Sequence, residues 1–142
     1  MTIKTSLRAI ALTTALSLTA AVAFARSADL VQPPRTELST AKPVTAAQVR
    51  NAILAAGPHH GWTLVSETPG VMTLQAATRA HSVTVDVAYD AHGFQVKFKS
   101  SENMGQEGSG DKITIHPHVN KWLSDFNEDI GGAVNAVSMQ TH

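Results

Sequence analysis

Histidine is the residue type with the most evident capacity for chemistry in this chain, which has seven histidines and no cysteine. Neutral imidazole is a good ligand for zinc, copper or nickel. Two close spacings occur, the adjacent pair His59 and His60 and the pair His116 and His118. A metal site needs three or four ligands that converge from several elements, so these four residues form the hypothesis of a divalent metal site. Surface exposure or helix capping accounts for the same histidines without a metal.

A second group of residues suggests recognition of a ligand. Ser101 and Asn103 stand at the start of a glycine-rich segment, and His116, Asn120 and Trp122 follow its end. Polar side chains beside an indole at the base of a loop can form a small site for a peptide, a glycan or a protein partner. The alternative is that Trp122 belongs to the core while Asn103 and His116 satisfy backbone groups of the loop.

Serine hydrolysis is a third hypothesis. Ser101 lies near the acidic residues Glu102 and Asp111 and upstream of His116, and a serine nucleophile needs a base and an oxyanion hole. The sequence lacks the G-x-S-x-G pattern of a nucleophile elbow. We therefore expect a binding protein with neither catalytic activity nor a cofactor.

The first 25 residues have the pattern of a secretory signal peptide. Lys4 and Arg8 precede an apolar segment over residues 9–23, and the small-x-small sequence A-F-A ends at Ala25. We expect cleavage after Ala25 and export to the periplasm through the Sec pathway. A membrane-spanning helix is the alternative, but the apolar run is shorter than the roughly 20 residues that a bilayer requires. The chain also lacks the cysteine that would carry a lipid anchor.

The charge of the exported chain limits its partners. Without the signal peptide it has nine basic and eleven acidic residues. A clustered basic surface is needed for binding nucleic acid or anionic lipid, so we expect neither as a partner. A periplasmic protein, peptide or glycan remains, and the sequence does not indicate an oligomeric state.

The exported chain divides into a leader and one domain. Residues 26–44 combine charge, serine, threonine and three prolines with no apolar period, which predicts a flexible leader. A single domain is expected over residues 45–140. It starts with a helix over residues 45–56, where Thr45 and Gln48 have the spacing of a capping box.

Four strands are predicted after this helix, over residues 62–67, 71–77, 81–89 and 94–99. The third strand shows the clearest period of two, which places His81 on its core face with a structural role. The hairpin register that aligns the two apolar faces pairs Tyr89 with Phe94 and places Asp86 opposite Lys97 on the solvent face.

The chain is predicted to end in a loop and a second helix. Residues 100–112 contain three glycines and few apolar residues, which predicts an exposed, mobile loop. A helix is expected from about residue 116, with a broad apolar face at spacings of three and four residues. The order α-β-β-β-β-α predicts an α+β fold, in which a four-stranded antiparallel meander has both helices packed on one face.

Several short segments together resemble a family. They are H-G-W at residues 60–62, S-S-E-N at 100–103 and I-H-P-H-V-N-K-W at 115–122. The pattern is similar to that of small secreted proteins and lipoproteins of proteobacteria, a group of uncharacterised function. The resemblance implies a compartment and a fold and no activity. Members of that group often have a lipidated cysteine, which this chain lacks, and many have tyrosine where this chain has Val119.

Overall fold

The computed structural model describes residues 26–40 and 42–140. The predicted signal peptide therefore lies outside the described residues. The elements in chain order are β1 (Ala28–Asp29), β2 (Thr36–Glu37), α1 (Ala46–Ala56), the 3-10 helix η1 (Gly57–His60), β3 (Trp62–Thr68), β4 (Val71–Thr78), β5 (His81–Tyr89), β6 (Gly93–Glu102), β7 (Glu107–Ser109), β8 (Lys112–Ile115) and α2 (His118–Gln140).

The predicted meander is present. Strands β3, β4, β5 and β6 pair antiparallel in chain order, which confirms the α+β class. The register of β5 with β6 is the predicted one and aligns Tyr89 with Phe94, Val87 with Val96, Val85 with Phe98 and Asp86 with Lys97. Local alternation of apolar and polar residues was sufficient to determine this hairpin, because a slip of one residue would turn its apolar side chains to solvent.

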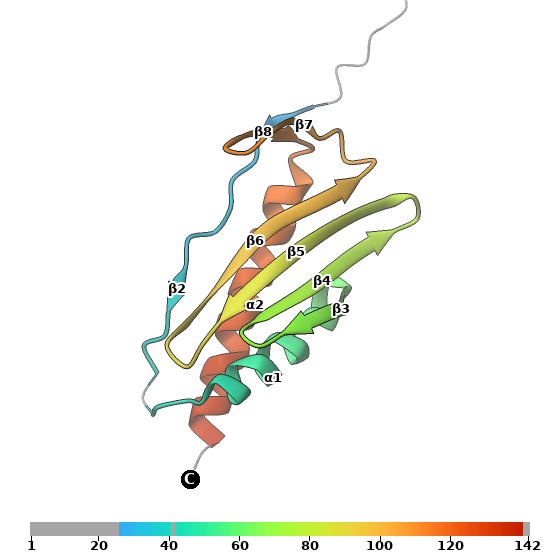
Figure 1. Ribbon diagram of the computed structural model, residues 1–142. Coiled ribbons are helices and arrows are strands. Elements are labelled where there is room, and N and C mark those ends of the chain that lie inside the picture. The colour runs from blue at the N-terminus through green and yellow to red at the C-terminus, as the bar shows by residue number, and fades with distance from the viewer. Residues whose placement is uncertain (1–25, 41, 141–142) are drawn as a thin grey trace, which may run out of the picture.

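The prediction of one four-stranded sheet is wrong in the number of strands and sheets. Strand β2 adds to β6, so the main sheet has five strands in the order β2-β6-β5-β4-β3. A second sheet has three short strands in the order β1-β8-β7. Figure 1 shows this small sheet next to the first turn of α2.

Over the residues that the structure describes, the leader contributes strands β1 and β2, where the sequence predicted no regular structure. Besides β1 and β2, the Gln32 side chain accepts a hydrogen bond from the Phe98 backbone N–H at 2.7 Å. Arg35 is within 3.0 Å of the Asp90 carboxylate in the β5–β6 turn. A Cβ on Gly93 would lie 2.6 Å from the Arg35 guanidinium, so this glycine permits the close approach of the leader. The leader thus covers one edge of the main sheet, where an unpaired strand would otherwise be open to pairing.

Residues 100–112 form strands, where a mobile loop was predicted. Strand β6 continues to Glu102, and β7 and β8 form a hairpin. Gly108 and Gly110 have φ angles of +83° and +62°, which other residues rarely adopt. The glycines that suggested mobility therefore serve the turn geometry of a short hairpin.

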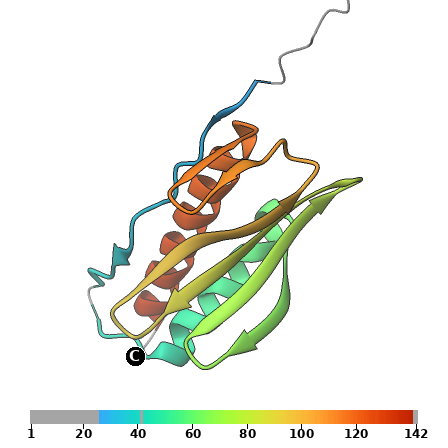
Figure 2. The same cartoon turned by 45° about the horizontal axis from the view of Figure 1, so that its top comes forward.

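Both helices cover the same face of the main sheet, as Figure 1 and Figure 2 show from two directions. The Thr45 and Gln48 capping box of α1 is formed as predicted. In the core, the indole of Trp62 stacks on Phe126 of α2 with ring centroids 4.9 Å apart. The core is thus built from Trp62 of β3, the apolar faces of β4, β5 and β6, and both helices. The β4–β5 turn and the chain after β6 lie at the end of the sheet that faces the first turns of α2.

Candidate functional site

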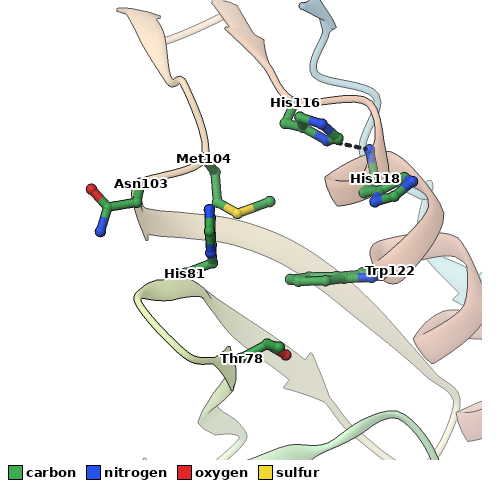
Figure 3. Close-up of a pocket in the computed structure, with 7 residues that line it drawn as sticks. All are labelled: Thr78, His81, Asn103, Met104, His116, His118 and Trp122. Carbon is green, nitrogen blue, oxygen red and sulfur yellow. Dashed lines mark hydrogen bonds between the residues drawn. The ribbon is translucent and has the colours of Figure 1, made fainter. Parts of the chain in front are cut away.

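A pocket of about 250 Å³ lies where the ends of the main sheet meet the first turn of α2. Three segments form its walls: the β4–β5 hairpin, the connection that follows β6, and the chain that enters α2. We call it the imidazole pocket, and Figure 3 shows its lining residues, which are Thr78, His81, Asn103, Met104, His116, His118 and Trp122.

The β4–β5 hairpin and the end of β6 are tied together by Asn103. Its backbone has a left-handed φ of +55°, a conformation that asparagine tolerates better than most residues. Its side-chain amide donates a hydrogen bond to the Ala80 carbonyl at 2.6 Å. The structural interpretation expected Asn103 to satisfy backbone groups of residues 100–112, but the bond is made to the β4–β5 turn, and it holds Asn103 at the pocket wall.

The entry to α2 is organised by His116. The His116 backbone N–H donates to the Met104 carbonyl at 2.9 Å, which places these two residues side by side. Its imidazole Nδ1 accepts a hydrogen bond from the His118 backbone N–H at 3.2 Å, so His116 caps the helix. Because Nδ1 is the acceptor, the proton of the neutral ring is assigned to Nε2. His116 therefore combines a capping role with a place in the pocket wall.

Trp122 and His118 share one face of α2. They are four residues apart, which places them one turn above each other. The His118 ring also contacts the His116 ring edge to face, with centroids 4.9 Å apart. Trp122 is half-buried, so one part of its indole belongs to the core and another is available to a ligand.

His81 differs from the prediction. It was expected on the core face of its strand, but its side chain is exposed, whereas Val83, Val85 and Val87 are buried. Strand β5 begins at His81, beyond the area that the helices cover, so this first side chain on the core face lines the pocket. Figure 3 shows the His81 imidazole beside Met104 and across the pocket from Trp122.

Three of the five predicted ligand-binding residues, Asn103, His116 and Trp122, meet in the imidazole pocket. The other two lie elsewhere. Ser101 Oγ donates to Gln106 Oε1 at 2.8 Å, and Asn120 binds the leader. Asn120 Oδ1 accepts from the Val31 N–H at 2.8 Å and its Nδ2 donates to the Asp29 carbonyl at 2.9 Å. Residues 118 and 120 differ by about 200° around a helix, which is why Asn120 faces away from the pocket.

The four predicted metal ligands form two separate pairs. His60 Nε2 lies 2.9 Å from Asp129 Oδ2 in the middle of α2. Asp129 is eleven residues after His118, about 16 Å along the helix axis, so His59 and His60 cannot join His116 and His118. Within residues 26–40 and 42–140, no three or more histidine, cysteine, aspartate or glutamate side chains are arranged to hold a metal ion.

The serine-hydrolase hypothesis gains no geometric support. The Ser101 hydroxyl donates to Gln106, and the Nδ1 atom of His116 is occupied by the helix cap. Neither group is hydrogen-bonded to the other in the described part of the chain.

The sequence provided no signal for Thr78, Met104 or His81 as pocket residues. Thr78 and His81 are paired across the β4–β5 hairpin, and Met104 is 6% exposed. The sequence could have linked Thr78 to His81 only through the hairpin pairing, and no sequence pattern linked these two residues to α2.

Comparisons with protein-family models, with curated proteins and with solved structures find no match. Among the residues that the structure describes, no helix is both long and apolar enough to cross a membrane. The function is therefore argued from the site itself.

Proposed function

We propose that this protein is an exported periplasmic binding protein without catalytic activity, and that the imidazole pocket is its ligand site. The observation that carries the proposal is the convergence of Asn103, His116 and Trp122 with His81 and His118 in one concave site. Such sites combine an apolar wall with a few polar groups that orient the ligand. Export is supported by the signal-peptide pattern of residues 1–25.

The size of the pocket limits the ligand. Its volume of about 250 Å³ is below the range of roughly 300–1,000 Å³ that is typical of drug-sized ligands. A small molecule, or the terminal group of a peptide or glycan, fits this volume. The proposed partner therefore presents one ring or side chain to Trp122 and leaves any remainder outside.

Binding is tested by NMR on the chain comprising residues 26–142 with a ¹⁵N label. Its two tryptophans give two indole signals, and Trp62 is 2% exposed, so Trp62 serves as an internal control. The probes are short peptides, N-acetylglucosamine oligomers and small aromatic acids and amides. We expect at least one class to shift the Trp122 signal and leave the Trp62 signal in place. No shift of Trp122 with any probe at millimolar concentration would contradict the proposal.

Export is tested separately, by fractionating cells that express the full chain. We expect a periplasmic protein whose first residue by mass spectrometry is Arg26. An uncleaved chain in the cytoplasm would contradict this part of the proposal and leave the ligand site untouched.

Metal binding is the second candidate function. It is favoured by the edge-to-face contact of His116 and His118 and by Met104, which is hydrogen-bonded to His116 through the backbone. Two imidazoles and a thioether are ligands that suit copper, and imidazoles alone suit zinc or nickel. We expect a metal to raise the melting temperature of the unmodified chain and of a His59→Ala/His60→Ala variant. It should not raise that of a His116→Ala/His118→Ala variant. The absence of any shift with zinc, copper or nickel would contradict this candidate.

A further inference from the structure

The walls of the imidazole pocket have an unusual charge character. None of the seven lining residues is aspartate, glutamate, lysine or arginine, and three of them are histidines. The acidic residue closest in sequence, Glu102, immediately precedes Asn103 and does not line the pocket. The lining side chains therefore include no carboxylate, and the three histidines supply imidazole N–H donors.

The three imidazoles are available for a ligand to different degrees. His116 presents Nε2–H, because its Nδ1 accepts the bond from His118. No hydrogen bond or ion pair involves the imidazoles of His81 or His118 among the described residues. Both of these side chains are exposed, so they can turn toward a bound group at little cost. Each imidazole has an N–H that can donate to a ligand.

An apolar surface complements these donors. Trp122 and Met104 line the same pocket, and Met104 is buried. An indole stacks well on a flat apolar group, and a thioether packs favourably against an aromatic edge. The pocket thus has an apolar wall next to imidazole donors.

We infer that the imidazole pocket recognises a carboxylate carried on a flat apolar group, an inference that rests on the proposed ligand site. A carboxylate supplies acceptors only, and these match the imidazole N–H donors of the pocket with charge-assisted hydrogen bonds. A cationic ligand would meet no opposite charge among the lining residues. Phosphate is usually held by arginine, lysine or clustered backbone N–H groups, and the lining residues include neither of these side chains.

Two sources can present this chemistry. One is a free aromatic acid, and the other is a peptide that ends in an aromatic residue with a free C-terminal carboxylate. Both place a ring on Trp122 and a carboxylate against the histidines. They differ in the backbone that would extend out of the pocket.

The test compares each acid with its neutral amide by NMR titration at pH 6. The probes are 3-phenylpropionate and 3-phenylpropanamide, then N-acetylglycylphenylalanine and its C-terminal amide, with chitobiose as a neutral sugar. A hydrogen bond to a charged group is stronger than a neutral one by an amount that corresponds to about a tenfold change in affinity. We expect at least one acid to bind about tenfold more tightly than its amide. The tighter of the two acids identifies the source.

A His81→Gln/His118→Gln variant removes two of the three imidazoles and leaves the cap in place, because the cap uses only the backbone N–H of His118. Both side chains are exposed, so the variant should fold. We expect the ratio of its affinities for acid and amide to fall close to one. A Ser101→Ala control, outside the pocket, should keep the ratio of the unmodified chain.

The outcomes separate this inference from the proposed function. Equal affinity for acid and amide, or tighter binding of chitobiose than of either acid, would overturn the inference that the pocket recognises a carboxylate. The pocket would still be a ligand site. A preference for the acid that persists in the double variant would also overturn that inference, because the imidazoles would not be its cause. If no probe moves the Trp122 signal, both the inference and the ligand site fail.

Discussion

Replacing Asn120 by alanine tests whether this residue anchors the leader or binds a ligand. Its amide bonds two backbone groups of the leader, accepting from the Val31 N–H at 2.8 Å and donating to the Asp29 carbonyl at 2.9 Å. The Asn120→Ala variant removes both bonds. The leader would keep its strand pairing with β8 and β6 and the hydrogen bond from Asn127 Nδ2 of α2 to the Thr36 hydroxyl at 3.2 Å, and it would lose both bonds to the Asn120 amide.

The expected magnitude follows from the two hydrogen bonds. Each contributes about 0.5–1.5 kcal/mol net, and both are exposed to solvent, which favours the lower part of this range. The free energy of local opening of the leader should therefore fall by about 1–2 kcal/mol, which corresponds to roughly 5–30-fold faster exchange of the leader amides. In the Asn120→Asp variant the leader amides should exchange at a rate between those of the unmodified chain and Asn120→Ala, because a carboxylate can still accept from Val31 and cannot donate to Asp29.

Native-state hydrogen exchange measures this opening amide by amide. Leu30 and Val31 report on the leader, because the Leu30 N–H donates to the Ile113 carbonyl at 2.8 Å. Asn135→Ala, at an exposed position of the same helix, is the matched control for the higher helix propensity of alanine. Unchanged exchange at Leu30 and Val31 in Asn120→Ala would refute the anchoring role. Loss of ligand binding with the leader still protected would instead return Asn120 to the ligand site that the sequence predicted.

Three further predictions concern the stability of the fold. Gly132→Ala should stabilise the protein by up to about 1 kcal/mol, since a Cβ there meets nothing within 4 Å. Gly57→Ala should destabilise it, because its Cβ would lie 2.8 Å from the Trp62 carbonyl. Thermal melts in which Gly57→Ala is the more stable of the two variants would contradict this. Phe126→Ala should lower the free energy of unfolding by about 3–5 kcal/mol, because Phe126 is fully buried and stacks on Trp62; a loss below about 1 kcal/mol in urea denaturation would mean that the stack does not organise the core. The backbone N–H of His92, followed by Arg35, lowers the pKa of Asp90, so its stabilising contribution is present above the ordinary pKa of about 3.9 and is lost as pH falls through the folded-state pKa. The urea midpoint of the unmodified chain should thus approach that of Asp90→Asn as pH falls from 6 to 2, and a constant gap between them would show that the carboxylate charge contributes nothing.

Local sequence patterns determined the middle of the molecule. The capping box at Thr45 and the alternation in β5 and β6 specify a helix and a hairpin, because each pattern has a period that only one type of element can bury. The register of Val87 with Val96 follows from the same alternation. The order of these elements in turn limits the chain to an antiparallel meander under two helices.

Tertiary pairing alone decided the leader and residues 100–112. Strands β1 and β2 have two residues each, too few to show any period. Their partners, β8 and β6, are far along the chain. The polar, proline-rich composition that suggested flexibility is also suitable for a short edge strand held by side chains such as Gln32 and Arg35.

Some residues of the candidate site could be predicted from the local sequence, and others only from the tertiary structure. The sequence by itself grouped Asn103, His116 and Trp122, because they surround one segment of the chain. Only the tertiary structure added His81, whose exposure depends on a strand that extends past the helices, and paired Asn120 with the leader. The angular spacing of α2 turns Asn120 away from the pocket. Residue types and spacing therefore indicated which chemistry was available, whereas the ends of strands and the faces of helices decided which side chains meet, since both depend on contacts between segments distant in sequence.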